Sequence, residues 1–206
     1  MVVAIDGPAG AGKSTVARAL ARRLGFTYLD TGAMYRCVGL VARERGRPAA
    51  DVAGELRIEL GDRVRVDGRD VTDAIRTAQA GEDASRAAAD PEVRRALVPM
   101  QQRILAHGDW VADGRDIATV VAPDARVKVF LTASEQERAR RRAAELGADP
   151  QAMLAELRAR DERDTGHGRA TLEPAPGAVT VDTTGLGIDE VVDRVAALVE
   201  RARARG

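Results

Sequence analysis

Near the start of the chain, a glycine-rich segment has the residue types and spacing that bind nucleotide phosphates. The pattern G-x-x-x-x-G-K-[ST] is matched by Gly7, Pro8, Ala9, Gly10, Ala11, Gly12, Lys13 and Ser14, followed by Thr15. Glycines allow positive φ, so the backbone can wrap a phosphate chain with its N–H groups pointing inward. In such a loop, Lys13 reaches the β- and γ-phosphates and the Ser14 hydroxyl binds Mg²⁺. The segment therefore predicts a nucleotide site.

The stretches on either side favour this interpretation over a flexible glycine-rich turn. Residues 2–5 are all apolar, which predicts a buried parallel strand. Residues 13–24 predict a helix, because Val16, Leu20 and Leu24 share one face. A strand that leads through the loop into a helix places the partial positive charge of the helix N-terminus at the phosphates.

A second group of polar residues follows the strand expected at 26–29. We expect Thr31 to cap the next helix and to offer its hydroxyl to an anion. Arg36 follows one turn later with a guanidinium suited to a phosphate. Ligands of doubly wound sheets bind at the carboxyl ends of strands, which favours a ligand role for both residues. The alternative is an ordinary helix start with a surface arginine.

A third group follows the strand expected at 110–112. We predict that Asp113 holds the hydration shell of Mg²⁺ opposite Ser14. Arg115 and Asp116 come next and are expected to point into the crevice with opposite charges. A surface ion pair is the alternative for these two residues.

Residues 143–169 predict a polar helical hairpin with few apolar anchors, which is typical of a mobile lid. Arg141 and Arg142 precede it and Arg160 lies within it, so the lid would bring positive charge to a transferring phosphoryl group. A closed lid would also keep out water that hydrolyses a nucleoside triphosphate. Arginines are common on solvated helices, so we expect about half of those in this region to be structural only.

Apolar runs alternate with amphipathic stretches along the whole chain, which predicts an α/β fold of the P-loop type with a doubly wound, five-stranded parallel sheet. The expected strands are 2–5, 26–29, 110–112, 126–131 and 178–182. The expected core helices are 13–24, 33–46, 91–107, 134–146 and 188–204. Within residues 47–90, alternation around Asp67-Gly68 predicts a hairpin with a type I′ turn.

Composition narrows the functional class. The 206 residues have zero net charge and few aromatic side chains, which argues against a protein that binds nucleic acid. Cys37 is the single cysteine, so we expect neither an intramolecular disulfide nor a cysteine metal cluster, and a reducing cytoplasmic location. We expect no signal peptide, no membrane span and, by default, a monomer.

Together these motifs resemble the bacterial cytidylate kinases, the (d)CMP kinases of the nucleoside monophosphate kinase group. The resemblance spans nearly the whole chain, and its anchors are residues 5–10 with 12–14, 28–36, 70–72 with 75–77, 93–94, 113–116 with 119–121 and 123–125, 160–164 and 181–184. It implies one kinase domain over 1–206, with ATP as donor and CMP or dCMP as acceptor. The implied parts are a core (1–46, 91–142 and 170–206), a monophosphate-binding insert (47–90) and a helical lid (143–169).

The resemblance also implies roles for single residues. The implied CMP-binding residues are Thr31, Tyr35, Arg36, Ser85, Arg94, Arg115, Asp116, Arg160 and Asp164. The implied catalytic residues are Lys13, Arg115, Arg141, Arg142 and Arg160. Within the first set, Ser85, Arg94 and Asp116 would read the base. A hydroxyl, a guanidinium and a carboxylate are complementary to the cytosine amine, N3 and O2, whereas uracil offers a carbonyl in place of the amine.

The sequence departs from the family pattern near the end of the lid. An Arg is usual three residues after Asp164, where this chain has His167, and Arg169 would substitute for it.

Two alternative functions stay open. One is a kinase for UMP, dTMP, AMP or a non-nucleotide acceptor such as a sugar acid. The other is a nucleotide-dependent switch with slow hydrolysis, although the chain has no Asn-Lys-x-Asp run that would read guanine.

Overall fold

The computed structural model describes residues 1–166 and 173–204, and the chain divides into two compact units. Unit 1 is Met1–Leu29 together with Leu105–Gly206, and unit 2 is Asp30–Ile104. Each unit has its own cluster of buried apolar side chains. None of the helices in the described ranges is both long enough and apolar enough to cross a membrane.

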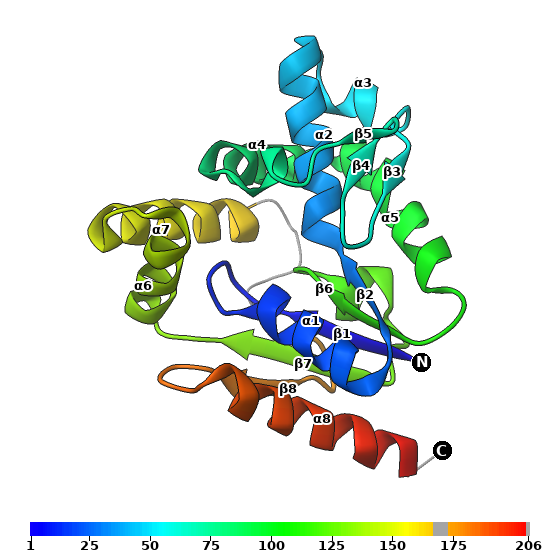
Figure 1. Ribbon diagram of the computed structural model, residues 1–206, viewed down its shortest axis with the longest axis vertical. Helices are drawn as coiled ribbons and strands as arrows, with labels where there is room; N and C mark the ends of the chain where they lie inside the picture. Colours follow the sequence, from blue (N-terminus) through cyan, green and yellow to red (C-terminus); the bar gives the residue numbers. More distant parts are fainter. Residues whose placement is uncertain (167–172, 205–206) are drawn as a thin grey trace. The chain divides into compact units, whose positions relative to one another are not determined.

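Unit 1 is built on a parallel sheet (Figure 1). Its elements are β1 (Val2–Asp6), α1 (Lys13–Leu24), β2 (Thr27–Asp30), β6 (Trp110–Asp113), a π-helix η2 (Ile117–Val121), β7 (Val127–Thr132), α6 (Glu135–Leu146), α7 (Pro150–Gly166), β8 (Val179–Asp182) and α8 (Ile188–Ala204). The strand order β2-β6-β1-β7-β8 confirms the five-stranded sheet that the sequence predicts. In its register Ile5 lies beside Asp113, so the carboxyl ends of β1 and β6 are adjacent.

The central strand β1 is apolar because it is enclosed by neighbours. Ile5 is fully buried, and it belongs to one apolar cluster with Leu20 of α1, Leu131 of β7 and Val195 of α8. Helices α1 and α8 run side by side against the sheet (Figure 1). Each large apolar side chain buried in this way contributes about 1.5–3 kcal/mol to the stability of the fold. The sheet therefore holds the loop after β1 in a fixed position.

The loop between β1 and α1 depends on a glycine at its first position. Gly7 has a φ of +146°, and a Cβ built on it would lie 2.0 Å from the carbonyl oxygen of Leu131. No side chain fits so close to the backbone of β7, and few residues other than glycine adopt this φ. The loop can therefore follow this path against β7 only with glycine here.

A short π-helix follows the loop that leaves β6. The N–H of Val121 donates to the carbonyl of Asp116 over 3.2 Å, and the N–H of Ala122 donates to that of Ile117 over 2.7 Å. Both bonds span five residues, one more than in an α-helix. Such turns are rare and frequently occur at functional sites. No pattern in the sequence predicts this element.

Unit 2 is mainly helical with a small antiparallel sheet. Its elements are α2 (Thr31–Arg45), α3 (Ala49–Ala53), β3 (Ile58–Glu59), β4 (Arg65–Val66), β5 (Arg69–Asp70), a 3₁₀ turn η1 (Ala74–Arg76), α4 (Ala78–Ala89) and α5 (Pro91–Leu105). Gly39 lets α2 approach α4 closely, since a Cβ there would lie 2.7 Å from that of Asp83. The φ values of Asp67 (+52°) and Gly68 (+82°) confirm the type I′ turn of the β4–β5 hairpin.

Unit 2 is larger than the insert expected at 47–90, because it also contains α2 and nearly all of α5. The reason is packing: Val38 of α2 and Leu97 of α5 join the same apolar cluster as Val66 of the small sheet. The range expected for the lid, 143–169, covers the end of α6 and all of α7. It also extends beyond Gly166 into residues outside the described part of the chain.

Candidate functional site

Lys13 is the first residue of α1, and its side chain is buried. Its Nζ donates to the carbonyl of Pro8 over 2.7 Å. Burial holds the pKa of Lys13 well below its usual value, and the nearby guanidinium of Arg115 lowers it further, with a smaller contribution from Arg160. Three of the predicted catalytic residues therefore lie close enough to interact. Their combined positive charge, partly offset by Asp113, favours a polyanion at this place.

Ser14 and Asp113, the two predicted Mg²⁺ residues, lie in direct contact, and their binding of the cation stays a prediction. The Ser14 hydroxyl donates to Oδ2 of Asp113 over 2.8 Å, and the phenol of Tyr28 donates to Oδ1 over 2.8 Å. The pair offers the hard oxygen ligands that Mg²⁺ prefers. In the described residues, no group of three or more His, Cys, Asp or Glu side chains could hold a metal ion. This donor set fits a cation that is held jointly by a substrate's phosphates.

Arg115 and Asp164 form an ion pair between the end of β6 and α7. Nε of Arg115 donates to Oδ2 of Asp164 over 3.0 Å. Asp164 is almost completely buried, whereas about a quarter of the Arg115 side chain is exposed (24%). The contact holds one edge of the guanidinium and leaves part of it accessible to a ligand.

Asp116 is buried just before η2, and Asp6 fixes the helix that follows it. The carboxylate of Asp6 accepts hydrogen bonds from the backbone N–H of Ile117 over 2.9 Å and of Ala118 over 2.8 Å. The pKa of Asp6 is raised to about 6, chiefly by burial and less by the nearby charge of Asp116, despite these two hydrogen bonds. Asp6 thus joins the end of β1 to the segment that carries Asp116.

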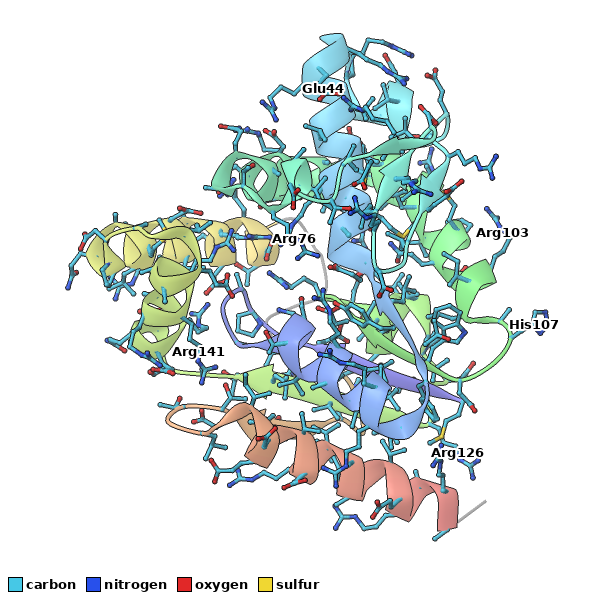
Figure 2. The ribbon with its side chains drawn as sticks, in the orientation of Figure 1. Glu44, Arg76, Arg103, His107, Arg126 and Arg141 are labelled. Atoms are coloured by element: carbon cyan, nitrogen blue, oxygen red, sulfur yellow. The ribbon has the colours of Figure 1, made fainter. Side chains whose placement is uncertain are left out.

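Arg141 and Arg142 lie on α6 and are held by protein oxygens. Arg141 is labelled in Figure 2. Its Nε donates to Glu137, while Nη1 and Nη2 donate to the hydroxyl and carbonyl of Thr183 over 2.9 and 2.7 Å. The guanidinium therefore ties α6 to the end of β8. Arg142 pairs with Glu145 over 2.9 Å. Their roles in phosphoryl transfer stay predictions.

The remaining predicted residues belong to unit 2. Ser85 of α4 is 3% exposed, and its hydroxyl has no hydrogen-bond partner within residues 1–166 and 173–204. Tyr35 and Thr31 are buried on α2. Arg36 and Arg94 are half-buried. A buried hydroxyl without a protein partner carries a desolvation cost, and a ligand that bonds to it removes that cost.

Thr31 does not cap α2, so that prediction is wrong. The cap is Asp30, whose Oδ1 accepts a hydrogen bond from the N–H of Ala33 over 2.8 Å, and Thr31 is the first residue inside the helix. Aspartate is a somewhat better N-cap residue than threonine, and it stands one position earlier. The hydroxyl of Thr31 is therefore not needed for the cap.

Three residues without a predicted role support the site. Tyr28 contacts Asp113, Arg138 contacts the phosphate loop, and Asp6 binds the backbone that follows Asp116. Asp6 could have been found, because a carboxylate at the carboxyl end of a central parallel strand is a common feature of ligand sites. Arg138 lies among several arginines of α6, and no pattern in the sequence distinguishes it from them. His167 and Arg169 lie outside the described residues.

Comparison with known proteins finds relatives over nearly the whole chain. Residues 3–201 match the model of the cytidylate kinase family. The cytidylate kinase of Carboxydothermus hydrogenoformans is 48% identical over 217 residues, which cover 98% of each chain. That of Pseudomonas aeruginosa strain LESB58 is 45% identical and covers 97% of this chain and 95% of its own.

Solved structures support the fold independently. A gluconokinase from Sinorhizobium meliloti 1021 has a TM-score of 0.53 at 19% identity and covers 98% of this chain and 94% of its own. At this identity the likeness concerns the fold only. The family match over nearly the whole sequence, together with relatives at nearly half identity, shows that the chain belongs to the cytidylate kinase family.

Proposed function

We propose that this protein transfers the terminal phosphoryl group of ATP to CMP and dCMP, giving ADP with CDP or dCDP, and that Mg²⁺ is required. Members of its family are phosphotransferases that phosphorylate CMP and dCMP. The observation that supports the proposal most is the environment of Lys13: a buried ammonium at the start of α1, with Arg115 and Arg160 nearby. Several phosphate charges bound together would offset the repulsion among these three cations.

The loop and its lysine would bind the donor. Backbone N–H groups at the start of α1 and the Lys13 ammonium would hold the β- and γ-phosphates. Nζ of Lys13 already donates to the carbonyl of Pro8, so a phosphate oxygen would enter a hydrogen-bonding position next to that bond. Arg115 and Arg160 would counter the charge that spreads over the transferring group, and Arg141 and Arg142 are the further candidates for this role.

Ser14 and Asp113 are the residues that would hold the cation, the hydroxyl directly and the carboxylate through its hydration shell. A bound Mg²⁺ would neutralise phosphate charge during the transfer. Tyr28 holds the other oxygen of Asp113 and so fixes the plane of the carboxylate. We assign no general base, because the acceptor phosphate is already anionic near neutral pH and transfer depends on position and charge.

For the acceptor, we propose that Ser85, Arg94 and Asp116 read cytosine. The buried hydroxyl of Ser85 supports this role, since it has no hydrogen-bond partner among the described residues. Asp116 is also buried, and a buried carboxylate strongly rejects a carbonyl in place of an amine. The proposed phosphate ligands of CMP are Thr31, Arg36 and Arg115, and the proposed sugar ligands are Arg160 and Asp164. Tyr35 is a further proposed CMP-binding residue.

The test is ADP formation from ATP and Mg²⁺ with CMP, dCMP, UMP, dTMP and AMP offered separately. We expect turnover with CMP and dCMP and little with the others. Turnover that prefers another acceptor would leave the phosphate loop intact and overturn the base-reading roles. ADP formation that is independent of any acceptor would contradict the kinase function. The cytoplasmic location and the monomeric state stay predictions, which fractionation and sedimentation would test.

A further inference from the structure

Arg138 of α6 has a position unlike that of the other arginines on its helix. Its side chain is only 6% exposed, and Nη1 donates to the carbonyl of Ala9 in the phosphate loop over 3.1 Å and forms an ion pair with Oδ2 of Asp161 over 2.7 Å. Asp161 belongs to α7, in the range expected to form the lid. One buried guanidinium thus joins the phosphate loop, α6 and α7.

Apolar packing supports the same junction. Ala9 is buried in a cluster with Ala139 and Ala143 of α6 and with Met153 and Leu157 of α7. This finding differs from the expectation of few apolar anchors in the lid segment. The α6–α7 hairpin is therefore packed against the loop by apolar side chains as well as by the ion pair.

The loop also lies against the backbone of Arg138. A Cβ built on Gly10 would lie 2.9 Å from both the Cβ and the carbonyl oxygen of Arg138. The loop thus has no room to shift toward α6 at this point. Any change in the position of Arg138 would be transmitted directly to the peptide between Ala9 and Gly10.

The orientation of this peptide matters for phosphate binding. In a planar trans peptide, the carbonyl of one residue and the N–H of the next point in opposite directions. Because Arg138 holds the carbonyl of Ala9, the N–H of Gly10 is turned away from Arg138. Phosphate loops bind their ligand through such N–H groups, so a fixed peptide plane is a fixed donor.

The Arg138–Asp161 pair is poorly explained by stability alone. Nε of Arg138 and Oδ1 of Asp161 are buried without hydrogen-bond partners in the part of the chain that the structure describes. Buried ion pairs that are incompletely satisfied are often no better than apolar residues of the same volume. A role in positioning the loop would account for charged residues at this place.

We propose that Arg138 and Asp161 are positioning residues for the phosphoryl donor: they hold the Ala9–Gly10 peptide in its binding orientation and make ATP affinity depend on the α6–α7 hairpin. This inference rests on the proposed function only in taking ATP as the ligand of the loop. Neither side chain needs to touch the substrate.

The chain offers a matched control. Glu135 and Arg158 also pair between α6 and α7, over 2.8 Å, but both side chains are largely exposed, and within the described residues they bond to each other and not to the phosphate loop. Exposed pairs contribute little to stability. Asp161→Asn and Arg138→Lys are therefore to be compared with Glu135→Gln and Arg158→Gln.

Calorimetric titration of each variant with Mg–ATP, and separately with CMP, measures the two affinities without turnover. We expect Asp161→Asn and Arg138→Lys to weaken ATP binding by about tenfold or more, because small errors in the position of binding groups are costly. CMP affinity should change by less than about twofold, as should both affinities in the two control variants. Equal ATP affinity in the test and control variants would overturn the proposal.

A double variant separates positioning from folding. Arg138→Met combined with Asp161→Leu replaces the buried pair with apolar side chains, which proteins often tolerate without loss of stability. We expect a melting temperature near that of the unmodified protein together with weak ATP binding. Normal ATP binding by the folded double variant would overturn the proposal. Failure of the unmodified protein to phosphorylate CMP would instead contradict the proposed function, while its ATP titration would still test this inference.

Discussion

Ser14 on α1 and Asp113 at the end of β6 are joined by a 2.8 Å hydrogen bond between Oγ and Oδ2. The two residues are far apart in sequence, and the parallel pairing of β1 with β6 brings their elements together. Their contact shows how the sheet assembles a site from separate segments: a hydroxyl in a phosphate loop and a carboxylate at the end of a strand.

This contact predicts the dependence on Mg²⁺. Asp113→Asn keeps the size of the side chain and removes its charge, so we expect the Mg²⁺ concentration for half-maximal CDP formation to rise about 10- to 100-fold. Tyr28→Phe removes only the bond to Oδ1 and should have a smaller effect in the same direction. Titration of Mg²⁺ at fixed ATP measures both, and EDTA should abolish activity throughout. An unchanged Mg²⁺ dependence in D113N would contradict the role of Asp113.

Replacing Lys13 should stabilise the folded protein while it abolishes most of the activity. Lys13→Met should lower turnover by about 10²- to 10³-fold, because the ammonium faces the developing charge. The pKa of Lys13 is lowered in the folded protein, so the unfolded chain holds the extra proton and stability rises with pH across the interval between the two pKa values. The variant should lack this dependence and melt at the same temperature or higher.

Lys128→Met on β7 is the control for this substitution, because it removes the other lysine of the chain from a half-buried position. It should leave turnover nearly unchanged. Thermal melts from about pH 7 to pH 10 and steady-state rates measure both properties. A K13M variant that is folded and turns over at a near-normal rate would refute the function of the phosphate loop.

Replacing Ser85 should change the substrate preference without loss of stability. Its hydroxyl is buried without a hydrogen-bond partner among the described residues, so Ser85→Ala should leave the free energy of unfolding equal or slightly higher. We expect the KM for CMP to rise about tenfold and the preference for CMP over UMP to fall. Unchanged KM values for both substrates would refute the base-reading role.

Thr77 on the same helix gives the opposite control. Its hydroxyl accepts a hydrogen bond from the N–H of Ala80 over 3.1 Å and so caps α4. Thr77→Ala should therefore lower stability by about 1 kcal/mol and leave the KM for CMP unchanged. The two variants together distinguish a ligand contact from a structural one.

Local patterns in the sequence were sufficient for much of the fold. Helices α1 and α8 have the bounds expected from their apolar spacing, and the Asp67-Gly68 turn has the predicted backbone conformation. The phosphate loop and its Ser14–Asp113 contact follow from a motif and from the rule that parallel strands share one carboxyl edge. These features depend on residues whose chemistry permits few alternatives.

Features that depend on tertiary packing could not be predicted. Arg138, Arg140, Arg141 and Arg142 are equivalent in sequence, but the rotation of α6 buries Arg138 against the loop and leaves Arg140 largely exposed. The π-helix at η2 has no compositional pattern, and the partner of its first two N–H groups, the Asp6 carboxylate, comes from β1. In both cases the deciding partner comes from a distant part of the chain.

Asp6 predicts how stability changes with pH. Its pKa is raised from 3.8 to about 6 in the folded protein, chiefly by burial, so the unfolded chain loses this proton first and stability falls as pH rises from about 4 to above 6. The carboxylate that forms above this pKa accepts two backbone N–H groups, whereas the amide of Asp6→Asn has a single oxygen to offer them. That amide does not titrate, so we expect the stability of the unmodified protein relative to the variant to fall by about 2 kcal/mol between pH 4 and pH 7. Urea unfolding of both proteins at each pH measures this difference, in which the titration of all other groups largely cancels. A difference that stays constant or grows with pH would mean that Asp6 ionises normally in the folded protein.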